Sequence, residues 1–590
     1  MNMLGLDTPE AVVKLSENQF YVIESKSTRT ALDQAVNEAV EYAEKINKSD
    51  IISAPLISGV AGNSADDFIV RSFMLKKGEY VPITMNDQEI TSLIHPEISR
   101  ILLTNGNPSI KDVPIDEKLF LSTAEKINEI LHNGAINKNY RARVMAALLL
   151  SMLQNTKPDV NAEPQILIQD INARVKYVLD REGKGEFIGQ IELALPPTSD
   201  NHIKFKGALV QTLHQLEKLN IRSAMKSGAD VLGSFYEVFL KYGNGAKEIG
   251  IVLTPRHITR FGVNILDIKI SDIVYDPTCG TGGFLVSAFD HIKKSATTSQ
   301  INKFKKYNIF GVDQESEVVA LAIVNMIFRG DGKNNIIEGN CLHKILLPDT
   351  IGTYPTAKYV AEKEMEEVLK EIAESKRGDR AVTKVLMNPP FALKSNDEKE
   401  YRFVQHALDQ MDHGGLLFSV LPLSSMFEGG EEKEWRLNKL LNENTLLAVI
   451  TFPPELFYPV GTHTLGIIVK KGAPHPSNQG VFWGRAVRDG FVKVKGKRLP
   501  SISEPNDFAT LTPLLQAFIQ NPSINIEPIP KFYKIAPIDY KDPLLELIPE
   551  RYIDSLPFNE QDLEEGMDRL VREQVSFIVR FKKEDEYEGN

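Results

Sequence analysis

The spacing of apolar and polar residues divides the chain into stretches with different predicted structure. In residues 1–75, short apolar runs are separated by polar turns and predict strands, and one longer segment has helical spacing. The predicted strands are residues 11–15, 20–23, 51–60 and 66–74, and the predicted helix is residues 31–46. This pattern indicates a small α/β domain over residues 1–113.

The second stretch, residues 114–245, consists mainly of amphipathic segments. Its apolar residues recur every three or four positions, which is typical of helices that bury one face. The predicted helices include residues 124–131, 141–153, 166–179, 204–219 and 230–240. The sequence therefore predicts a helical domain, and its side chains indicate no chemistry of their own.

In the third stretch, residues 246–475, apolar runs of strand length alternate with helical segments. Such alternation is typical of a doubly wound parallel sheet, so the fold class is α/β. The predicted strands are residues 273–275, 308–312, 335–338, 384–387, 415–421, 446–452 and 464–470. A segment rich in Glu and Lys, residues 360–379, predicts a solvated helix inserted in a loop.

The last stretch, residues 476–590, predicts a hairpin over residues 481–499 and helices over residues 507–519 and 560–581. The hairpin contains six basic residues: Arg485, Arg488, Lys493, Lys495, Lys497 and Arg498. They are candidates for contacts with nucleic-acid phosphates, and a simple solvated hairpin is the alternative.

A glycine-rich turn follows the first predicted strand of the doubly wound sheet. Residues 276–285 read Asp-Pro-Thr-Cys-Gly-Thr-Gly-Gly-Phe-Leu and lead into a segment with helical spacing. Glycine lets the backbone approach a ligand closely, and the free N–H groups of a helix start attract anionic groups. By itself the turn predicts only that a nucleotide-like ligand binds here.

A second motif, Asn388-Pro389-Pro390-Phe391, follows the predicted strand 384–387. The carboxyl ends of parallel strands lie at the ligand-binding edge of such sheets, so this motif and the glycine turn share an edge. The prolines restrict the backbone, and the Asn388 oxygen and Pro389 carbonyl can then accept hydrogen bonds from an amine. Phe391 offers a face for a planar base. A rigid turn is the alternative.

Polar residues stand at two further strand ends of the same sheet. Asp313 ends the predicted strand 308–312, where a carboxylate can accept hydrogen bonds from ribose hydroxyls, and Asn340 follows the next strand. Thr254 and Pro255, upstream, are placed to close over a ligand. Each polar strand end could instead cap a helix, but their order at successive strands favours one shared ligand site.

In this order the motifs resemble those of the N6-adenine DNA methyltransferases. Residues 230–240 and 414–422 narrow the resemblance to the modification subunit of type I restriction–modification systems and its relatives. Phe457, Tyr458 and Pro459 look like that family's motif near the target base. The resemblance covers about residues 165–540, and Asn340 stands where the family usually has aspartate.

The resemblance implies a Rossmann-like sheet that binds S-adenosylmethionine and methylates N6 of adenine in DNA. The cofactor-binding residues that it implies are Thr254, Pro255, Asp276, Thr278, Gly280, Gly282, Gly283, Phe284, Asp313 and Asn340. The catalytic residues that it implies are Asn388, Pro389, Pro390 and Phe391. An adenine flipped out of the duplex would stack on Phe391, and no metal is needed because catalysis is mainly positioning.

The first domain carries Glu10 immediately before one predicted strand, and Glu24 and Lys26 at the end of the next. Two carboxylates and a lysine in this arrangement can hold a divalent cation and orient water. With Pro9 before Glu10, the segment resembles the nuclease-like N-terminal domain of restriction enzymes, where Glu10 replaces the usual aspartate. Mg²⁺ is implied only if this domain is an active nuclease. The alternatives are an inert or DNA-docking domain, or charges on an exposed strand edge.

Composition bears on partners and location. With 590 residues, two cysteines and no long apolar run, the chain reads as a cytoplasmic protein without a membrane span. A net charge of −11 argues against DNA binding by this chain alone. About 120 residues follow the sheet, little room for a target-recognition domain. Double-stranded DNA, a separate specificity subunit and a restriction subunit are therefore the expected partners.

Other functions fit parts of the pattern. The same motifs serve methyltransferases that act on adenine in RNA or on glutamine in proteins. A combined restriction and modification polypeptide with an active Mg²⁺-dependent nuclease is a further alternative. A non-catalytic DNA-docking subunit is disfavoured by the intact run from Asn388 to Phe391.

Overall fold

The computed structural model describes residues 8–218, 253–360, 381–553, 567 and 571, except residues 50, 65, 66, 86, 87, 91, 92, 95, 111–116, 155, 333, 352, 353, 393–396, 458–460, 495, 496, 502 and 503. The chain forms two compact units, Met1–Val263 with Ile268–Pro390, and Asn264–Asp267 with Phe391–Asn590. Within the described ranges, no helix has the length and apolar character needed to cross a membrane. The predicted four-domain division stays a prediction, and its boundaries at residues 113 and 245 lie outside the described residues.

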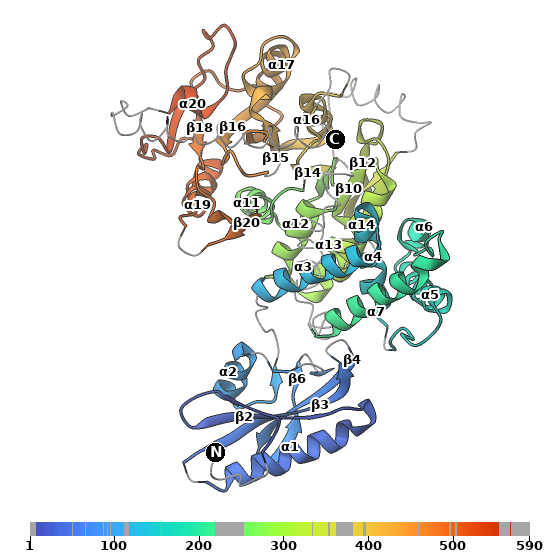
Figure 1. The fold of residues 1–590 in the computed structure, drawn as a ribbon. Helices are drawn as coiled ribbons and strands as arrows, with labels where there is room; N and C mark the ends of the chain where they lie inside the picture. The colour runs from blue at the N-terminus through green and yellow to red at the C-terminus, as the bar shows by residue number, and fades with distance from the viewer. Residues whose placement is uncertain are drawn as a thin grey trace. The chain divides into compact units, whose positions relative to one another are not determined.

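The first unit begins with a five-stranded sheet of order β1-β2-β3-β4-β5 and a helix, α1, along one face (Figure 1). The strands are Ala11–Lys14, Gln19–Lys26, Ser53–Ser64, Asp67–Lys76 and Glu79–Pro82, and α1 is Leu32–Asn47. β3 runs parallel to β2, and the other neighbours pair antiparallel. A Cβ on Gly59 would lie 2.5 Å from Val36 of α1, so glycine allows the close approach of helix and sheet. The predicted strands and helix are confirmed here.

Short elements follow this sheet: strands Thr84–Met85, Gln88–Glu89 and Ser109–Ile110, and α2, Pro96–Asn105. The helical region then contains α3 to α7, with bounds Glu117–Asn133, Lys138–Ser151, Pro164–Arg181, Ile188–Ile191 and His202–Lys218. α4 is almost wholly buried, whereas α5 buries one face. Four of the predicted helices are confirmed, and the fifth, residues 230–240, lies outside the described residues.

The first unit also contains four parallel strands in the order β11-β10-β9-β14. β9, β10, β11 and β14 are Val274–Asp276, Ile309–Asp313, Asn335–Glu338 and Val382–Met387. α11, α12, α13 and α14 are Arg256–Leu266, Gly283–Lys293, Thr298–Tyr307 and Ser316–Phe328. All four strands match predicted ones within two residues. β9, β10 and β14 are mostly buried apolar runs of strand length, whereas β11 buries only Ile336.

A hairpin that the sequence did not predict follows β11. Its strands are β12, Leu346–Ile351, and β13, Tyr354–Tyr359. The hydroxyl of Tyr359 donates to the carbonyls of Gly311 and Asn335 at 3.0 and 3.1 Å, so the hairpin is tied to the strands β10 and β11. The solvated helix predicted over residues 360–379 lies outside the described residues, apart from residue 360.

The second unit contains five strands in the order β15-β17-β16-β18-β21. They are Met411–Pro422, Thr464–Lys471, Asn444–Thr451, Gly480–Arg485 and Tyr533–Pro537. The helices are α16, Glu400–Asp409, α17, Glu431–Trp435, α18, Leu441–Glu443, α19, Asp507–Gln520, and α20, Pro549–Tyr552. β17 lies antiparallel between β15 and β16, so this part of the predicted sheet is mixed and not wholly parallel.

The hairpin predicted over residues 481–499 is wrong in its first half. Residues 480–485 form β18, which pairs with β16 and β21, because Val481, Phe482 and Trp483 are apolar enough to be buried in the sheet. The true hairpin is shorter and joins β19, Phe491–Val494, to β20, Lys497–Pro500. Most of the helix predicted over residues 560–581 lies outside the described residues.

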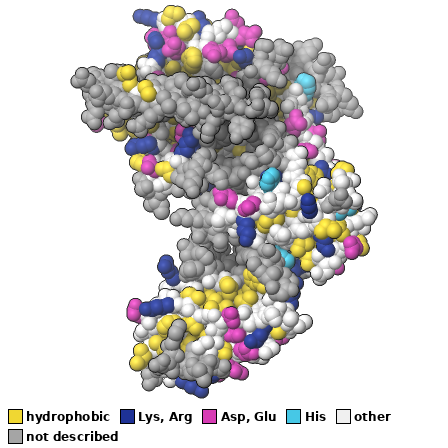
Figure 2. Space-filling model, viewed as in Figure 1, with side chains coloured by type: hydrophobic (Ala, Val, Ile, Leu, Met, Phe, Trp, Pro, Cys, Tyr) yellow, Lys and Arg dark blue, Asp and Glu magenta, His cyan; other side chains and the backbone are white. Residues whose placement is uncertain are grey.

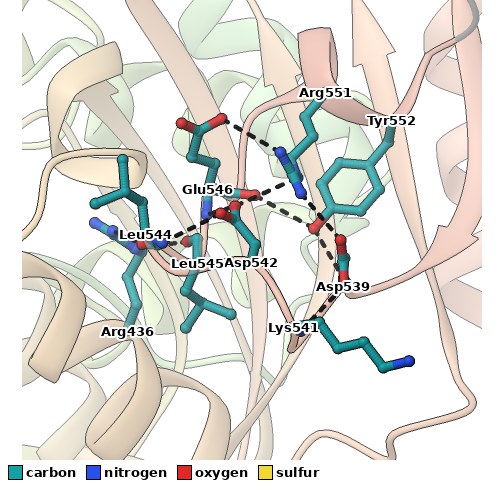
Figure 3. A network of polar contacts seen from close by, with 9 residues as sticks. All are labelled: Arg436, Asp539, Lys541, Asp542, Leu544, Leu545, Glu546, Arg551 and Tyr552. Carbon is teal, nitrogen blue, oxygen red and sulfur yellow. Dashed lines mark hydrogen bonds and ion pairs between the residues drawn. The ribbon is translucent and has the colours of Figure 1, made fainter.

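A buried arginine holds the segment around residues 544 and 545 in place (Figure 3). Arg436 is 0% exposed, and its guanidinium donates to the carbonyls of Leu544 and Leu545 at 2.9 and 3.2 Å. It also donates to the carbonyls of Ser425 and Glu428 at 2.9 and 2.6 Å. Burial lowers the pKa of Arg436 to about 10, so the side chain stays charged at neutral pH.

We expect Arg436→Met to destabilise the second unit by about 3 kcal/mol, because four backbone carbonyls lose a charged donor, and the hydrogen bonds to those of Ser425 and Leu545 are buried. Calorimetry should show a lower melting temperature for this unit. Lys439→Met is the matched control, since Lys439 is an exposed residue of the same segment, paired with Glu443, and its loss should change stability by less than about 1 kcal/mol. Equal melting temperatures for Arg436→Met and the unaltered protein would contradict this role.

Candidate functional site

The glycine-rich turn lies between β9 and α12, where the sequence predicts it. Gly280 and Gly282 have φ angles of 53° and 82°, in the left-handed region that favours glycine. The Cys279 N–H donates to the carbonyl of Val312 on β10 at 2.9 Å. The turn is therefore fastened to β10 as well as to the strand that precedes it.

Two carboxyl groups, the buried Asp276 and the half-buried Asp313, shape this turn. Asp276, the last residue of β9, is 1% exposed and accepts the Thr278 N–H at 3.1 Å. Asp313, the last residue of β10, accepts the N–H groups of Gly280 and Glu315 at 3.0 and 3.1 Å. Burial raises the pKa of Asp276 and of Asp313, because it removes solvent from the charged forms. The backbone donors offset part of this cost.

Two contacts that the sequence analysis missed hold the turn and its helix. Asn325 of α14 donates to the carbonyl of Thr281 within the turn at 3.0 Å. Thr259 of α11 and Ser287 of α12 share a hydroxyl hydrogen bond of 2.6 Å. A lone amide among the apolar residues of α14 was a signal for Asn325, whereas no sequence pattern indicated the Thr259–Ser287 contact.

Asn388 follows β14 and meets Thr254, a residue 134 positions earlier in the chain. Its amide nitrogen donates to the Thr254 hydroxyl at 3.0 Å. Its amide oxygen is buried, and no group among the described residues hydrogen-bonds it. Pro389 is buried and Pro390 is exposed. The structure thus brings two predicted site residues together and leaves one buried acceptor available.

Phe391 belongs to the second unit, where its ring lies edge to face with that of Phe457. The ring centroids are 5.9 Å apart, and Phe457 is 5% exposed. The next residue, Ala392, donates its N–H to the buried carboxylate of Glu400 at 2.6 Å. Glu400 therefore fixes the backbone beside Phe391. Residues 458–460 of the predicted target-base motif lie outside the described residues.

The other predicted cofactor residues have different surroundings. The Thr278 hydroxyl is buried and has no partner in the described part of the chain, whereas Phe284 is 2% exposed within α12. Pro255 is buried at the start of α11, and Gly283 is the first residue of α12. Asn340 is exposed and caps a short 3₁₀ helix, with its oxygen accepting the Leu342 N–H at 3.0 Å. The Asn340 oxygen therefore caps a helix, as the alternative interpretation of the sequence predicted, and the amide nitrogen remains available to a ligand.

Three charged residues cluster in the N-terminal sheet domain. Lys26 donates to Glu24 at 3.4 Å and to Glu38 of α1. Glu38 was not among the predicted residues, and its hydrogen bond raises the pKa of Lys26. Glu10 takes part through its backbone, whose N–H donates to Glu24 at 3.1 Å. Across the described ranges, no three His, Cys, Asp or Glu side chains are grouped so that they could hold a metal.

The basic residues near β18 and the β19–β20 hairpin are paired with carboxylates. Arg485 meets Glu550 at 3.3 Å, Arg488 meets Asp507 at 2.9 Å, Lys493 meets Glu455 at 3.1 Å and Arg498 meets Asp489 at 2.6 Å. Lys495 and the side chain of Lys497 lie outside the described residues. These pairs reduce the positive charge that this segment offers to phosphates.

Comparison with known proteins gives a consistent result. The family model described as N-6 DNA Methylase matches residues 227–539. The Type II restriction enzyme and methyltransferase RM.BcgI of Heyndrickxia coagulans is 28% identical over 78% of this chain and 71% of its own length. The Type I restriction enzyme EcoEI methylase subunit of Escherichia coli is 28% identical over 48% of this chain, and the match spans 56% of that subunit.

Among solved structures, a chain from a study of complex assembly in the type I restriction–modification system has a similar fold. It superposes with a TM-score of 0.51 at 18% identity, over 81% of this chain and 100% of that chain. The Rossmann-like α/β fold is therefore confirmed by a structural relative as well as by the strands themselves.

We expect Glu400→Ala to loosen the backbone beside Phe391, because the Ala392 N–H loses its acceptor at a cost of about 1–3 kcal/mol. Hydrogen exchange of the Ala392 amide should become faster, and Glu400→Gln, which keeps an acceptor oxygen, should restore part of the protection. Glu398→Ala is the control, since Glu398 is exposed and pairs with Arg402. Unchanged exchange in Glu400→Ala would show that this contact does not hold the loop.

Proposed function

This chain belongs to the N-6 DNA methylase family, and we propose that its glycine turn and its Asn388 motif transfer a methyl group from S-adenosylmethionine to N6 of adenine in DNA. The single observation that carries the proposal is the buried Asn388 oxygen, which has no partner among the described residues. It lies in the same compact unit as the glycine turn and Asp313. We therefore assign to this chain the function of a site-specific adenine methyltransferase in a restriction–modification system.

The residues around the glycine turn fit S-adenosylmethionine. Gly280 and Gly282 present backbone without a side chain, and the buried Thr278 hydroxyl has no partner in the described residues, as expected of a group that meets a polar ligand. Each oxygen of Asp313 has a second lone pair, with which it can accept a ribose hydroxyl. Asn340 retains its amide nitrogen for the adenine ring. When bound, the cofactor supplies an activated methyl group on a sulfonium.

Asn388 and Pro389 are assigned to the target amine. The Asn388 oxygen accepts one N–H of the adenine amine, and the Pro389 carbonyl accepts the other. Both acceptors then hold the amine with its lone pair directed at the methyl group. With the cofactor bound, the methyl–sulfur bond would break as the N–C bond forms and would leave a neutral thioether, and the amine nitrogen would then lose one proton to solvent. The nitrogen becomes more positive before that proton leaves, so these two hydrogen bonds strengthen in the transition state and favour transfer.

Phe391 and Phe457 are assigned to the flipped base. An adenine that leaves the duplex loses stacking with its neighbours, and an aromatic face returns part of that energy. The Phe391 ring is held by its edge-to-face contact with Phe457, which limits its rotation before the base arrives. Phe391 therefore provides the stacking face, and Phe457 supports it.

Double-stranded DNA is the proposed substrate, with a separate specificity subunit as the main partner and a restriction subunit as a further one. The net charge is −11, and the basic residues near β18 and β19 form ion pairs. On the face drawn in Figure 2, described Lys and Arg side chains are interspersed with Asp and Glu. The described part of this face offers weak electrostatic attraction to DNA, and we assign most phosphate contacts to another subunit.

A second candidate function concerns the N-terminal sheet domain, for which we propose DNA cleavage. Glu24 and Lys26 end β2, which runs parallel to β3, and Glu38 of α1 reaches the same lysine. The Heyndrickxia coagulans relative is named as both a restriction enzyme and a methyltransferase. Mg²⁺ often keeps several waters and takes only one or two carboxylates, which Glu24 and Glu38 can supply.

We expect Asn388→Ala and Phe391→Ala to abolish methylation of unmodified DNA and to leave binding of S-adenosylmethionine within about twofold, since both residues serve the base. Incorporation of labelled methyl groups should be measured with and without the proposed specificity and restriction subunits. Calorimetric titration with the cofactor provides the binding constant. Methylation at an unaltered rate in either variant would refute the assignment of the motif.

For the N-terminal domain, we expect Mg²⁺-dependent cleavage that Lys26→Ala removes and Lys14→Ala, an exposed lysine on β1, retains. Mg²⁺ binding should persist in Lys26→Ala because Glu24 and Glu38 remain. Methylation should be the same in both variants. Absence of cleavage by the unaltered protein with its partner subunits would show that the domain is not a nuclease.

A further inference from the structure

The hydrogen bond between Thr254 and Asn388 assigns Thr254 a role other than cofactor contact. The Asn388 nitrogen donates to the Thr254 hydroxyl at 3.0 Å, and the Asn388 oxygen is left buried without a partner among the described residues. We propose that Thr254 is a positioning residue that holds the Asn388 amide with its oxygen presented to the reacting amine. This inference rests on the function proposed above for Asn388.

The two ends of an asparagine amide have similar shape and opposite chemistry. The oxygen accepts hydrogen bonds, and the nitrogen carries two donors. A target amine also presents donors, so a reversed Asn388 amide would place N–H groups against N–H groups. The observed orientation leaves one buried oxygen unpaired before substrate binds. The reversed one would leave a buried NH₂ group without an acceptor, and unpaired buried N–H groups are rarer in proteins than unpaired oxygens.

The position of the Thr254 hydroxyl is itself fixed by local structure. Pro255 follows it, and a proline restricts the residue before it to extended conformations. The Pro255 carbonyl then begins α11 by accepting the N–H groups of Ile258 and Thr259 at 2.9 and 3.1 Å. Thr259 is hydrogen-bonded at 2.6 Å to Ser287 of α12, the helix that starts at the glycine turn. Thr254 is therefore linked, through α11, to the helix that begins at the glycine turn.

Thr254 should therefore affect the rate of methyl transfer. Because the Asn388 oxygen bonds most strongly to the amine when that nitrogen becomes positive, its orientation matters more in the transition state than in the ground state. Loss of the Thr254 hydroxyl should therefore lower kcat. A direct contact with the cofactor would instead weaken cofactor binding and leave kcat unchanged at saturation.

The test compares Thr254→Val, which keeps the shape and removes the hydroxyl, with Thr254→Ser, which keeps the hydroxyl. Both are measured in the full chain with its partner subunits and unmodified DNA. We expect Thr254→Val to lower kcat roughly tenfold, with the Kd for S-adenosylmethionine and the KM for DNA within about twofold. Thr254→Ser should retain kcat within about threefold of the unaltered protein. Thr254→Ala removes the same hydroxyl and is the second variant if Thr254→Val does not fold.

Three outcomes would overturn the proposal. Weaker cofactor binding with unaltered kcat in Thr254→Val would make Thr254 a cofactor contact. Equal losses in Thr254→Val and Thr254→Ser would show that side-chain shape matters and the hydroxyl does not. Full activity in Thr254→Val would exclude any role. If Asn388→Ala remains active, the proposed function itself fails; if Asn388→Ala is inactive and Thr254→Val is fully active, only this inference fails.

Discussion

Parallel pairing of β9 with β10 on one side and β14 on the other is the constraint on which the site depends. Val274 and Tyr275 pair with both neighbours, so the three carboxyl ends come out at one edge of the sheet. Asp276, Asp313 and Asn388 stand at or next to those ends. A slip of one register position would turn each of these side chains toward the wrong face. The pairing of the strands therefore has to be correct before any single residue at this edge can take part in the chemistry.

Buried polar atoms show how the site is prepared for ligands. Backbone N–H groups donate to Asp276 and Asp313, whose pKa values burial raises. The fold therefore keeps two carboxyl groups at this edge although their charged forms lose solvation. Thr278 and Asn388 each leave one buried oxygen without a partner among the described residues. Such atoms are costly in a closed core, and a polar ligand would satisfy them. Polar groups with hydrogen-bond partners thus belong to the framework of the site, and buried oxygens without partners mark where a ligand would bind.

In the second unit, by contrast, most described charged side chains have partners. Arg436 donates four hydrogen bonds to backbone carbonyls, and most described basic side chains near β18 and β19 have carboxylate partners. These groups stabilise the segment that ends at α20 and leave little charge to attract DNA. In the N-terminal domain, Lys26 likewise lies between Glu24 and Glu38. A cation that enters this cluster would have to displace the lysine from at least one carboxylate.

The sequence alone determined most strands of the two main sheets, though not β5 or β21, and the two motifs, because buried strands, glycine turns and proline pairs have local signatures. The four strands of the parallel group and the five main elements of the N-terminal domain lie where apolar spacing predicts them. Tertiary structure decided the rest: that β18 joins a sheet, that β12 and β13 form a hairpin, and that charged side chains pair. The contact between Thr254 and Asn388 spans 134 positions, and Asn325 reaches Thr281 across 44. Such contacts depend on the packing of α11 beside α12 and of α14 against β10 and β11, which no local pattern of residues encodes.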